Sequence, residues 1–385
     1  MLLLFFIGLL LSPMSTYIFH GIGFPIVLPE LIFIPILFYK YKYLGISFVR
    51  KPAFSLSIIA TVLLILFSFI TQDISIVAAI STARSFLIVF VFYDIGLKIR
   101  FDENFIRVCL IISLGSIIGW SLNNYLTIAT GAYLKGNGIL YGNMIAIPLC
   151  FASSLLFMSN YWIFALAFLD NIYLSMTSGL RRQILVSAIS ALLSMLFATV
   201  SGFSFKKQVV SIAIVAGLVV ALPYMGSYLL DNNELLYNRV VLRTINLTEG
   251  VSNEGDDTRS SNSTKFIDEA DQLIIPHGFV SFQTDKGGKG VFVDSPTYML
   301  AYTFGLIPFL FYMLYYLARL GRCFIKAFLK RSKEYGFIFI TSSVVFILHF
   351  VESSMFSFSF TAPMTGICIG LLFRRDIIKT INNVF

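Results

Sequence analysis

The chain has 385 residues, of which 57% are apolar and only 12% are charged. Because soluble domains are typically about 25% charged, this composition excludes a soluble globular protein, a disordered chain and a coiled coil. The net charge of +8 is typical of a membrane protein oriented by basic cytoplasmic loops, so we expect no nucleic-acid partner. The composition therefore predicts an all-α protein that crosses a membrane many times.

Apolar stretches separated by polar residues predict about twelve transmembrane helices, since each crossing needs about 20 apolar residues. The predicted helices cover residues 2–19, 22–39, 54–71, 74–97, 104–123, 139–158, 160–176, 183–199, 208–230, 296–318, 335–352 and 355–373. We expect one integrated domain, in which residues 1–230 form nine helices, residues 231–295 form a large outer loop and residues 296–385 form the last three helices.

Basic residues in short loops decide the orientation of such a protein. If the N-terminus is cytoplasmic, most of these residues fall in cytoplasmic loops, in the groups 40–51, 98–107, 206–207, 319–333 and 374–379. We therefore expect both termini in the cytoplasm and the 231–295 loop on the outer, periplasmic side. Apolar residues at helical spacing between Phe266 and Ile274 predict a short helix within that loop.

Two adjacent arginines, Arg181 and Arg182, stand at the predicted outer start of the helix at 183–199, after residues 177–179. A helix N-terminus repels cations, and short outer loops generally avoid basic residues. A bound anion would remove both objections, because backbone N–H groups and two guanidinium groups would converge on it. The alternative is that both side chains reach out to lipid headgroups.

The outer loop contains further arginines, Arg239, Arg243 and Arg259. Arg239 and Arg243 lie one helical turn apart, where like charges destabilise a helix. An anion bound between them would remove this penalty. The alternative is that the acidic residues of the same loop neutralise them.

Three charged residues lie inside predicted transmembrane helices: Glu30, Arg84 and Asp170. Each costs about 2.5–3.5 kcal/mol at the membrane centre on insertion scales. Either they line a polar cavity, or Arg84 forms an ion pair with Glu30 or Asp170. Both interpretations remain open at this point.

His277 and Asp294 lie in the outer loop, close to the predicted membrane surface. A lone histidine in such a loop is more often solvated or structural than catalytic. Asp294 precedes Pro296 by two residues, so it could simply cap the helix that starts there. The four cysteines do not have the spacing of metal ligands, so we expect no metal site.

This architecture resembles the Wzy-type O-antigen and surface-polysaccharide polymerases, which are integral-membrane glycosyltransferases related to the O-antigen ligases. The resemblance rests on the number of helices, on the basic segment 177–182 and on the late, arginine-rich outer loop. It also rests on three short segments, Ile274-Ile275-Pro276-His277-Gly278, Asp294-Ser295-Pro296-Thr297-Tyr298 and Phe304-Gly305. Ligases usually carry a histidine where this chain has Asp294, which favours a polymerase.

The resemblance implies a transfer without metal or cofactor at the outer face of the bacterial inner membrane. The donor would be a glycan on undecaprenyl pyrophosphate, the acceptor a lipid-linked repeat unit, and a chain-length regulator protein a further partner. The pyrophosphate would be bound by Arg181, Arg182, Arg239, Arg243 and Arg259. The base would be Asp294 or, as second choice, His277. The alternatives are an O-antigen ligase and a flippase that transports lipid-linked oligosaccharides.

Overall fold

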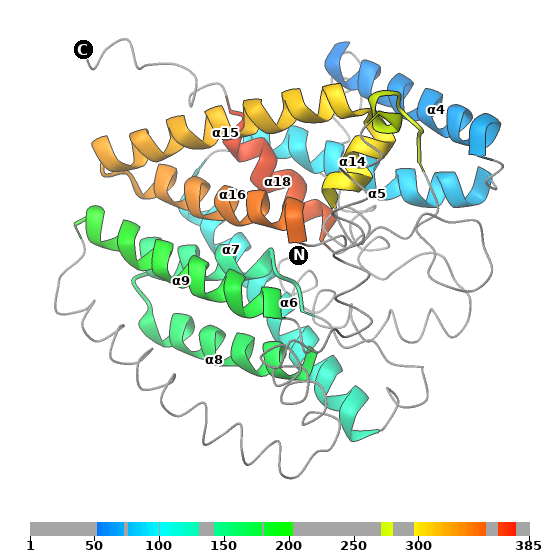
Figure 1. Cartoon of the computed structure of the whole chain (residues 1–385). Coiled ribbons are helices and arrows are strands. Elements are labelled where there is room, and N and C mark those ends of the chain that lie inside the picture. Colours follow the sequence, from blue (N-terminus) through cyan, green and yellow to red (C-terminus); the bar gives the residue numbers. More distant parts are fainter. Residues whose placement is uncertain are drawn as a thin grey trace, which may run out of the picture. The chain divides into compact units, whose positions relative to one another are not determined.

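The structure is a computed structural model that describes residues 52–72, 76–99, 101–130, 142–178, 181–202, 271–279, 296–351 and 361–374. Helices make up most of these residues and no strand occurs among them (Figure 1). This confirms the predicted all-α class. Three helical segments are long and apolar enough to cross a membrane: Glu103–Ala129, Arg182–Val200 and Lys333–Val351. The predicted helices at 2–19, 22–39 and 208–230 lie outside the described residues.

The main helices are α4 (Pro52–Gln72), α5 (Ile76–Lys98), α6 (Glu103–Ala129), α7 (Ala146–Ala152), α8 (Tyr161–Ser178), α9 (Arg181–Val200), α14 (Pro296–Phe304), α15 (Leu306–Leu329), α16 (Lys333–Val351) and α18 (Ala362–Leu372). A π-helical segment, η1 (Ser153–Phe157), continues α7, and a 3-10 turn, η3 (Gln272–Ile274), lies in the predicted outer loop. The predicted boundaries of α4, α5, α8, α9 and α16 agree with the structure to within two residues.

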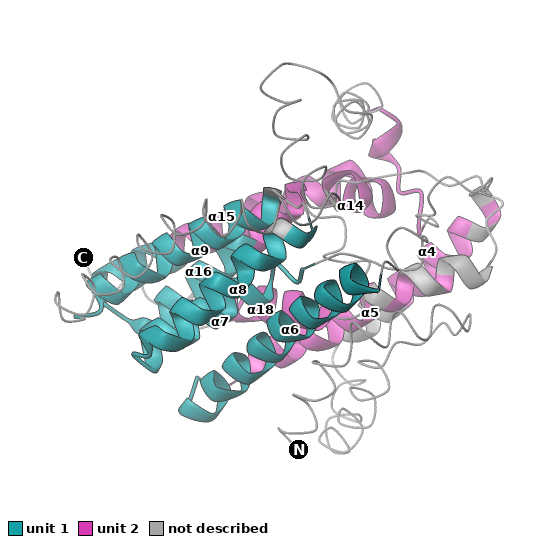
Figure 2. Cartoon of the chain, turned by 90° about the horizontal axis from the view of Figure 1, so that it is seen from below, with its two compact units in different colours: residues 1–28, 100–257, 323–344 teal, residues 29–99, 258–322, 345–385 magenta. Residues whose placement is uncertain are grey.

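The helices belong to two compact units, each assembled from segments that are distant in the sequence (Figure 2). Unit 1 comprises residues 1–28, 100–257 and 323–344, and unit 2 comprises residues 29–99, 258–322 and 345–385. Unit 1 therefore contains α6 to α9, and unit 2 contains α4, α5, α14 and α18. The long helices α15 and α16 contribute one end to each unit.

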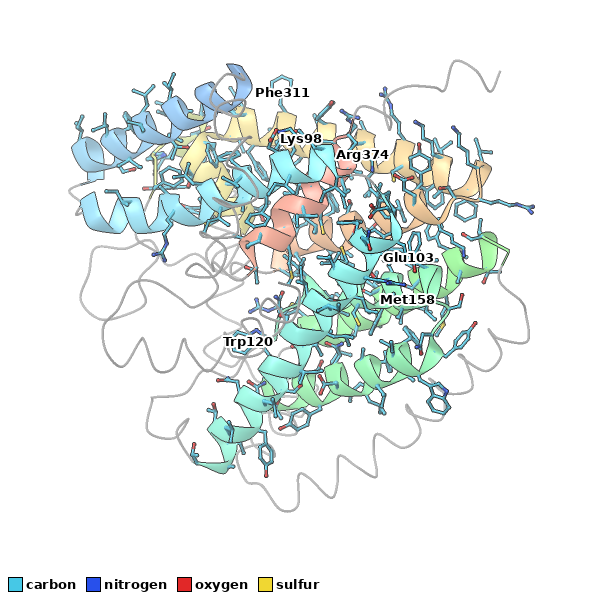
Figure 3. The ribbon with its side chains drawn as sticks, turned by 180° about the vertical axis from the view of Figure 1, so that it is seen from behind. Lys98, Glu103, Trp120, Met158, Phe311 and Arg374 are labelled. Atoms are coloured by element: carbon cyan, nitrogen blue, oxygen red, sulfur yellow. The ribbon has the colours of Figure 1, made fainter. Side chains whose placement is uncertain are left out.

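Helix α6, on which Figure 3 labels Glu103 and Trp120, is longer than its sequence predicts. It begins after Asp102, whose carboxylate accepts the N–H of Phe105 at 2.7 Å and so caps the first turn. The predicted end at residue 123 is wrong, because α6 continues through Asn123 and Asn124 to Ala129. Both asparagines are buried. The polar residues at which the predicted helix ends therefore lie in the interior of unit 1.

The interior of unit 1 contains the short helix α7, which packs against α6, α8 and α9. The sequence predicts a helix over 139–158, whereas α7 begins at Ala146 and has Pro148 in its first turn. Every residue of α7 is buried. The preceding Asn143 donates a hydrogen bond to Ser116 of α6 at 2.9 Å. This bond between two polar side chains fixes the entry to α7 against α6.

The predicted single helix at 296–318 is two helices, α14 and α15. The break occurs at Gly305, whose φ of +93° is a left-handed conformation that favours glycine. Pro308, which has no N–H to donate, lies in the first turn of α15. Helix α15 then runs to Leu329, eleven residues beyond the predicted end at 318.

In unit 2, glycines allow α5 and α18 to pack with their backbones in contact. A Cβ atom at Gly366 would lie 2.5 Å from the carbonyl oxygen of Val89, and one at Gly96 would lie 2.6 Å from the carbonyl oxygen of Ile367. Gly370 meets the backbone of Tyr93 in the same way. Gly366 and Gly370 form the four-residue spacing that brings membrane helices together.

Arg319 fixes the end of α18 within unit 2. Its position was assigned to a cytoplasmic loop, but it lies inside α15 and is only 3% exposed. The guanidinium donates to the carbonyl oxygen of Arg374 at 3.3 Å and to the hydroxyl of Tyr315 at 2.5 Å. A cation at a helix C-terminus is favourable, so Arg319 has a structural role.

Candidate functional site

The structure describes half of the predicted site residues. Outside the described residues lie Glu30, Arg239, Arg243, Arg259 and Asp294. Unit 1 contains Arg181, Arg182 and Asp170, and unit 2 contains His277 and Arg84. The described site residues therefore fall into two local arrangements, one in each unit.

His277 lies in the predicted outer loop, at its contact with the end of α14 in unit 2. Its backbone N–H donates to the carbonyl of Tyr302 at 2.8 Å, and the N–H of Gly278 donates to the carbonyl of Thr303 at 3.3 Å. These carbonyls belong to the last turn of α14, whose acceptors have no partner within the helix. The imidazole of His277 stacks on the ring of Tyr302, with centroids 4.4 Å apart. Main-chain bonds and ring stacking thus hold His277 in one orientation.

The residues around His277 pack this corner tightly. Gly278 has a φ of +81°, and a Cβ atom there would lie 2.6 Å from the carbonyl oxygen of Leu64 in α4. Phe279 is fully buried, with its ring 5.2 Å from that of Phe86 in α5. A Cβ atom at Gly305 would lie 3.1 Å from the carbonyl oxygen of Ile274. The segments 274–278 and 304–305, which are separate in the sequence, are therefore in contact.

The start of α14 is held by a residue that the sequence analysis missed, His349 of α16. The hydroxyl of Thr297 donates to the carbonyl of His349 at 3.0 Å. The His349 ring is fully buried and lies 3.0 Å from the hydroxyl of Tyr312. The sequence feature that could have identified His349 is a histidine within an apolar stretch.

In unit 1, Arg182 lies at the turn that joins α8 to α9. Helix α9 begins at Arg181, so the predicted position of the two arginines at a helix N-terminus is confirmed. The preceding turn is fixed by buried side chains: Asn124 of α6 donates to the hydroxyl of Thr177 at 3.0 Å. Arg182 itself is half-buried. The backbone N–H groups of the first turn of α9 and Arg182 thus lie at the same helix start. Such an arrangement suits the binding of an anion.

Asp170 lies on α8 inside unit 1 and is half-buried. It lies near Ser121 of α6, and its Oδ2 atom has no hydrogen-bond partner in the part of the chain that the structure describes. Arg84 lies on α5 of unit 2. The alternative that these two residues form an ion pair stays a prediction, as does a pair between Arg84 and Glu30.

Among the described residues, no group of three or more His, Cys, Asp or Glu side chains could hold a metal ion. No family model, curated protein or solved structure matches the chain. Function must therefore be argued from the chemistry of the residues and from their arrangement.

Proposed function

We propose that the chain polymerises undecaprenyl-pyrophosphate-linked repeat units into O-antigen or a related surface polysaccharide, at the outer face of the bacterial inner membrane. The observation that carries the proposal is the pairing of His277 and Gly278 with the end of α14. This pairing fastens the end of the outer loop to the helix that follows Asp294 in the sequence. Two of the segments on which the family resemblance rests, 274–278 and 304–305, are therefore in contact in this chain.

The proposed reaction transfers a glycan between two lipid carriers. The hydroxyl of the acceptor sugar attacks the anomeric carbon of the donor glycan, and the bond from that carbon to the pyrophosphate breaks. The leaving pyrophosphate keeps the electron pair and remains on undecaprenol. Arginine side chains can stabilise its charge without a metal ion. Arg181, Arg182, Arg239, Arg243 and Arg259 take this role in the proposal.

The acceptor hydroxyl must lose a proton during this attack. Asp294 is the proposed base, because its carboxylate can accept the proton and because it directly precedes the helix whose two ends are held by Thr297 and His277. His277 is the second choice. Its backbone N–H donates a hydrogen bond to α14.

Two substitutions test whether Asp294 or His277 is the base. Asp294→Asn keeps an oxygen that can cap a helix but removes the ionisable group, so we expect normal protein level and loss of the long-chain glycan ladder. His277→Gln leaves the main-chain bonds of the loop intact and should retain measurable polymerisation. A normal ladder from Asp294→Asn together with no ladder from His277→Gln would assign the base to His277.

A flippase for lipid-linked oligosaccharides is the second candidate, favoured by the polar residues buried within unit 1. Deletion of the gene distinguishes the functions. Loss of a polymerase leaves surface glycans of a single repeat unit, whereas loss of a flippase leaves none. Loss of a ligase leaves long polymer on the undecaprenyl carrier. Surface glycan with a single repeat unit is the outcome that the proposal requires.

A further inference from the structure

The buried face of α9 is polar along most of its length. Gln183, Ser187, Ser190 and Ser194 recur at helical spacing, and each is 4% exposed or less. At a rise of 1.5 Å per residue, they extend over about 16 Å of the helix. They occupy the interior side of a helix that is long and apolar enough to cross a membrane. A face in this position normally carries apolar side chains.

Most polar atoms on this face make no hydrogen bond within the part of the chain that the structure describes, although Oε1 of Gln183 accepts the hydroxyl of Ser178 at 3.4 Å. The amide nitrogen of Gln183 and the hydroxyls of Ser187, Ser190 and Ser194 have no hydrogen-bond partner in the described ranges of the chain. A hydroxyl in a helix can bond to the carbonyl four residues earlier, and Thr199 of the same helix does so at 2.9 Å. The three serines do not use this route.

Helix α8, which packs against α9, adds a second and independent observation. Asn171 lies on the face of α8 that is buried within unit 1, and it is completely inaccessible. Its amide nitrogen donates to the carbonyl of Ala167 at 2.7 Å, whereas its Oδ1 atom has no partner among the described residues. The adjacent Asp170 also has an oxygen without a partner there. Two neighbouring helices thus present unsatisfied donors and acceptors.

The segment η1, which also packs against α9, continues the same pattern. Ser153 at its start is fully buried, and its hydroxyl has no partner in the part of the chain that is described. Ser154, the next residue, instead donates to the carbonyl of Phe151 at 3.1 Å. Neighbouring serines therefore differ in whether their hydroxyls are satisfied within the protein.

Polar groups at membrane depth are costly unless they bond within the protein or line a water-filled cavity. We propose that α8, α9 and η1 line a hydrated site within unit 1 that binds hydroxyl groups, either of water or of a sugar. Serine hydroxyls and amides both donate and accept, as hydroxyl ligands do. The carboxyl of Asp170, the residue next to Asn171 in α8, disfavours an anion, so this site differs in chemistry from the arginines. The assignment of a sugar as the ligand rests on the proposed function, whereas the presence of water in the site does not.

Cysteine labelling in membranes tests the hydration. Ser187→Cys and Ser190→Cys change one atom on the polar face, whereas Leu192→Cys places the thiol on the outer face of α9, where the side chain is 67% exposed in the structure. A sulfonated thiosulfonate reagent is charged, so it reacts only with thiols that are accessible to water. Mass spectrometry identifies the labelled position, so the native cysteines can remain. We expect both serine variants to react at least tenfold faster than Leu192→Cys.

The outcomes distinguish the ligands. Equal or slower labelling of both serine variants, in protein present at normal level in the membrane, would overturn the hydrated site. Labelling is then compared between cells that make the lipid-linked repeat unit and cells blocked at its first sugar transfer. Slower labelling where the repeat unit is made supports a sugar ligand, and equal rates reject the sugar and leave water. Because labelling needs no polymerisation, it stays informative if the proposed function fails.

Discussion

The hydroxyl of Tyr312 lies 3.0 Å from Nε2 of His349 within unit 2. Nδ1 of the same ring lies 2.7 Å from the carbonyl oxygen of Val345, so Nδ1 carries the proton and Nε2 accepts the hydrogen bond from Tyr312. The carbonyl of His349 in turn accepts the hydroxyl of Thr297. Helices α14, α15 and α16 are therefore connected through one buried histidine, next to the start of α14.

Tyr312→Phe should destabilise this connection, because the buried Nε2 atom of His349 then loses its donor. Measured interhelical hydrogen bonds in membranes average about 0.6 kcal/mol and reach about 1.7 kcal/mol, and we expect the upper part of this range. Thermal unfolding in detergent, followed by circular dichroism, measures the change. The control is Tyr125→Phe, at a residue that is 61% exposed. An equal effect of the two variants would contradict the assigned bond.

Gly366→Ala should be strongly destabilising, because the added methyl group would lie 2.5 Å from the carbonyl oxygen of Val89. Overpacking of this kind costs about 1–3 kcal/mol or more. Gly321→Ala in α15 is the matched control, since nothing lies within 4 Å of its Cβ position. There the substitution should stabilise the helix by up to about 1 kcal/mol. Effects of the same sign in both variants would argue against close packing of α5 and α18.

Gly278→Ala tests whether the end of the outer loop packs on α4. Alanine in a left-handed conformation costs about 1–2 kcal/mol, and at Gly278 the methyl group also collides with Leu64 and Ser68. Gly202→Ala has the same backbone penalty, with a φ of +85°, but nothing within 4 Å. We expect Gly278→Ala to unfold at a clearly lower temperature and to shorten the glycan ladder. Identical unfolding temperatures would mean that the loop does not pack there.

Arg181→Ala and Arg182→Ala should abolish long glycan chains without lowering the protein level. A cation is unfavourable at a helix start, so removal of either charge should relieve this repulsion. Lysine should rescue poorly, because it lacks the bidentate guanidinium geometry. Arg107→Ala is the control, since Arg107 forms an exposed ion pair with Glu103, and such pairs contribute little to stability. Full-length polymer from both alanine variants would refute the pyrophosphate-binding role.

Reporter fusions test the expected orientation. The basic residues of the short loops predict that Lys206 is cytoplasmic and that Gly255 is periplasmic. A fusion at Lys206 should activate a cytoplasmic reporter, and one at Gly255 should activate a periplasmic reporter. A cytoplasmic Gly255 would separate the outer loop from its proposed substrates and so overturn the mechanism.

The sequence alone was sufficient to predict the helical class and the boundaries of half of the ten main helices that the structure describes. The boundaries of α4, α5, α8, α9 and α16 follow from the lengths of apolar stretches, because a membrane-spanning helix satisfies its backbone hydrogen bonds within itself. The location of Arg181 and Arg182 at a helix start follows from the same local pattern. These features depend on neighbouring residues only.

Other features depend on contacts between distant residues, and only the tertiary structure decided them. Helix α6 extends past its predicted end because Asn124 bonds to Thr177, 53 residues later. His277 meets the end of α14 through backbone atoms, which carry no signature of residue type. His349 gains a structural role only because Tyr312 and Thr297 lie beside it. Apolar patterns specify which segments form helices, whereas the pairing of polar groups between helices depends on how those helices pack.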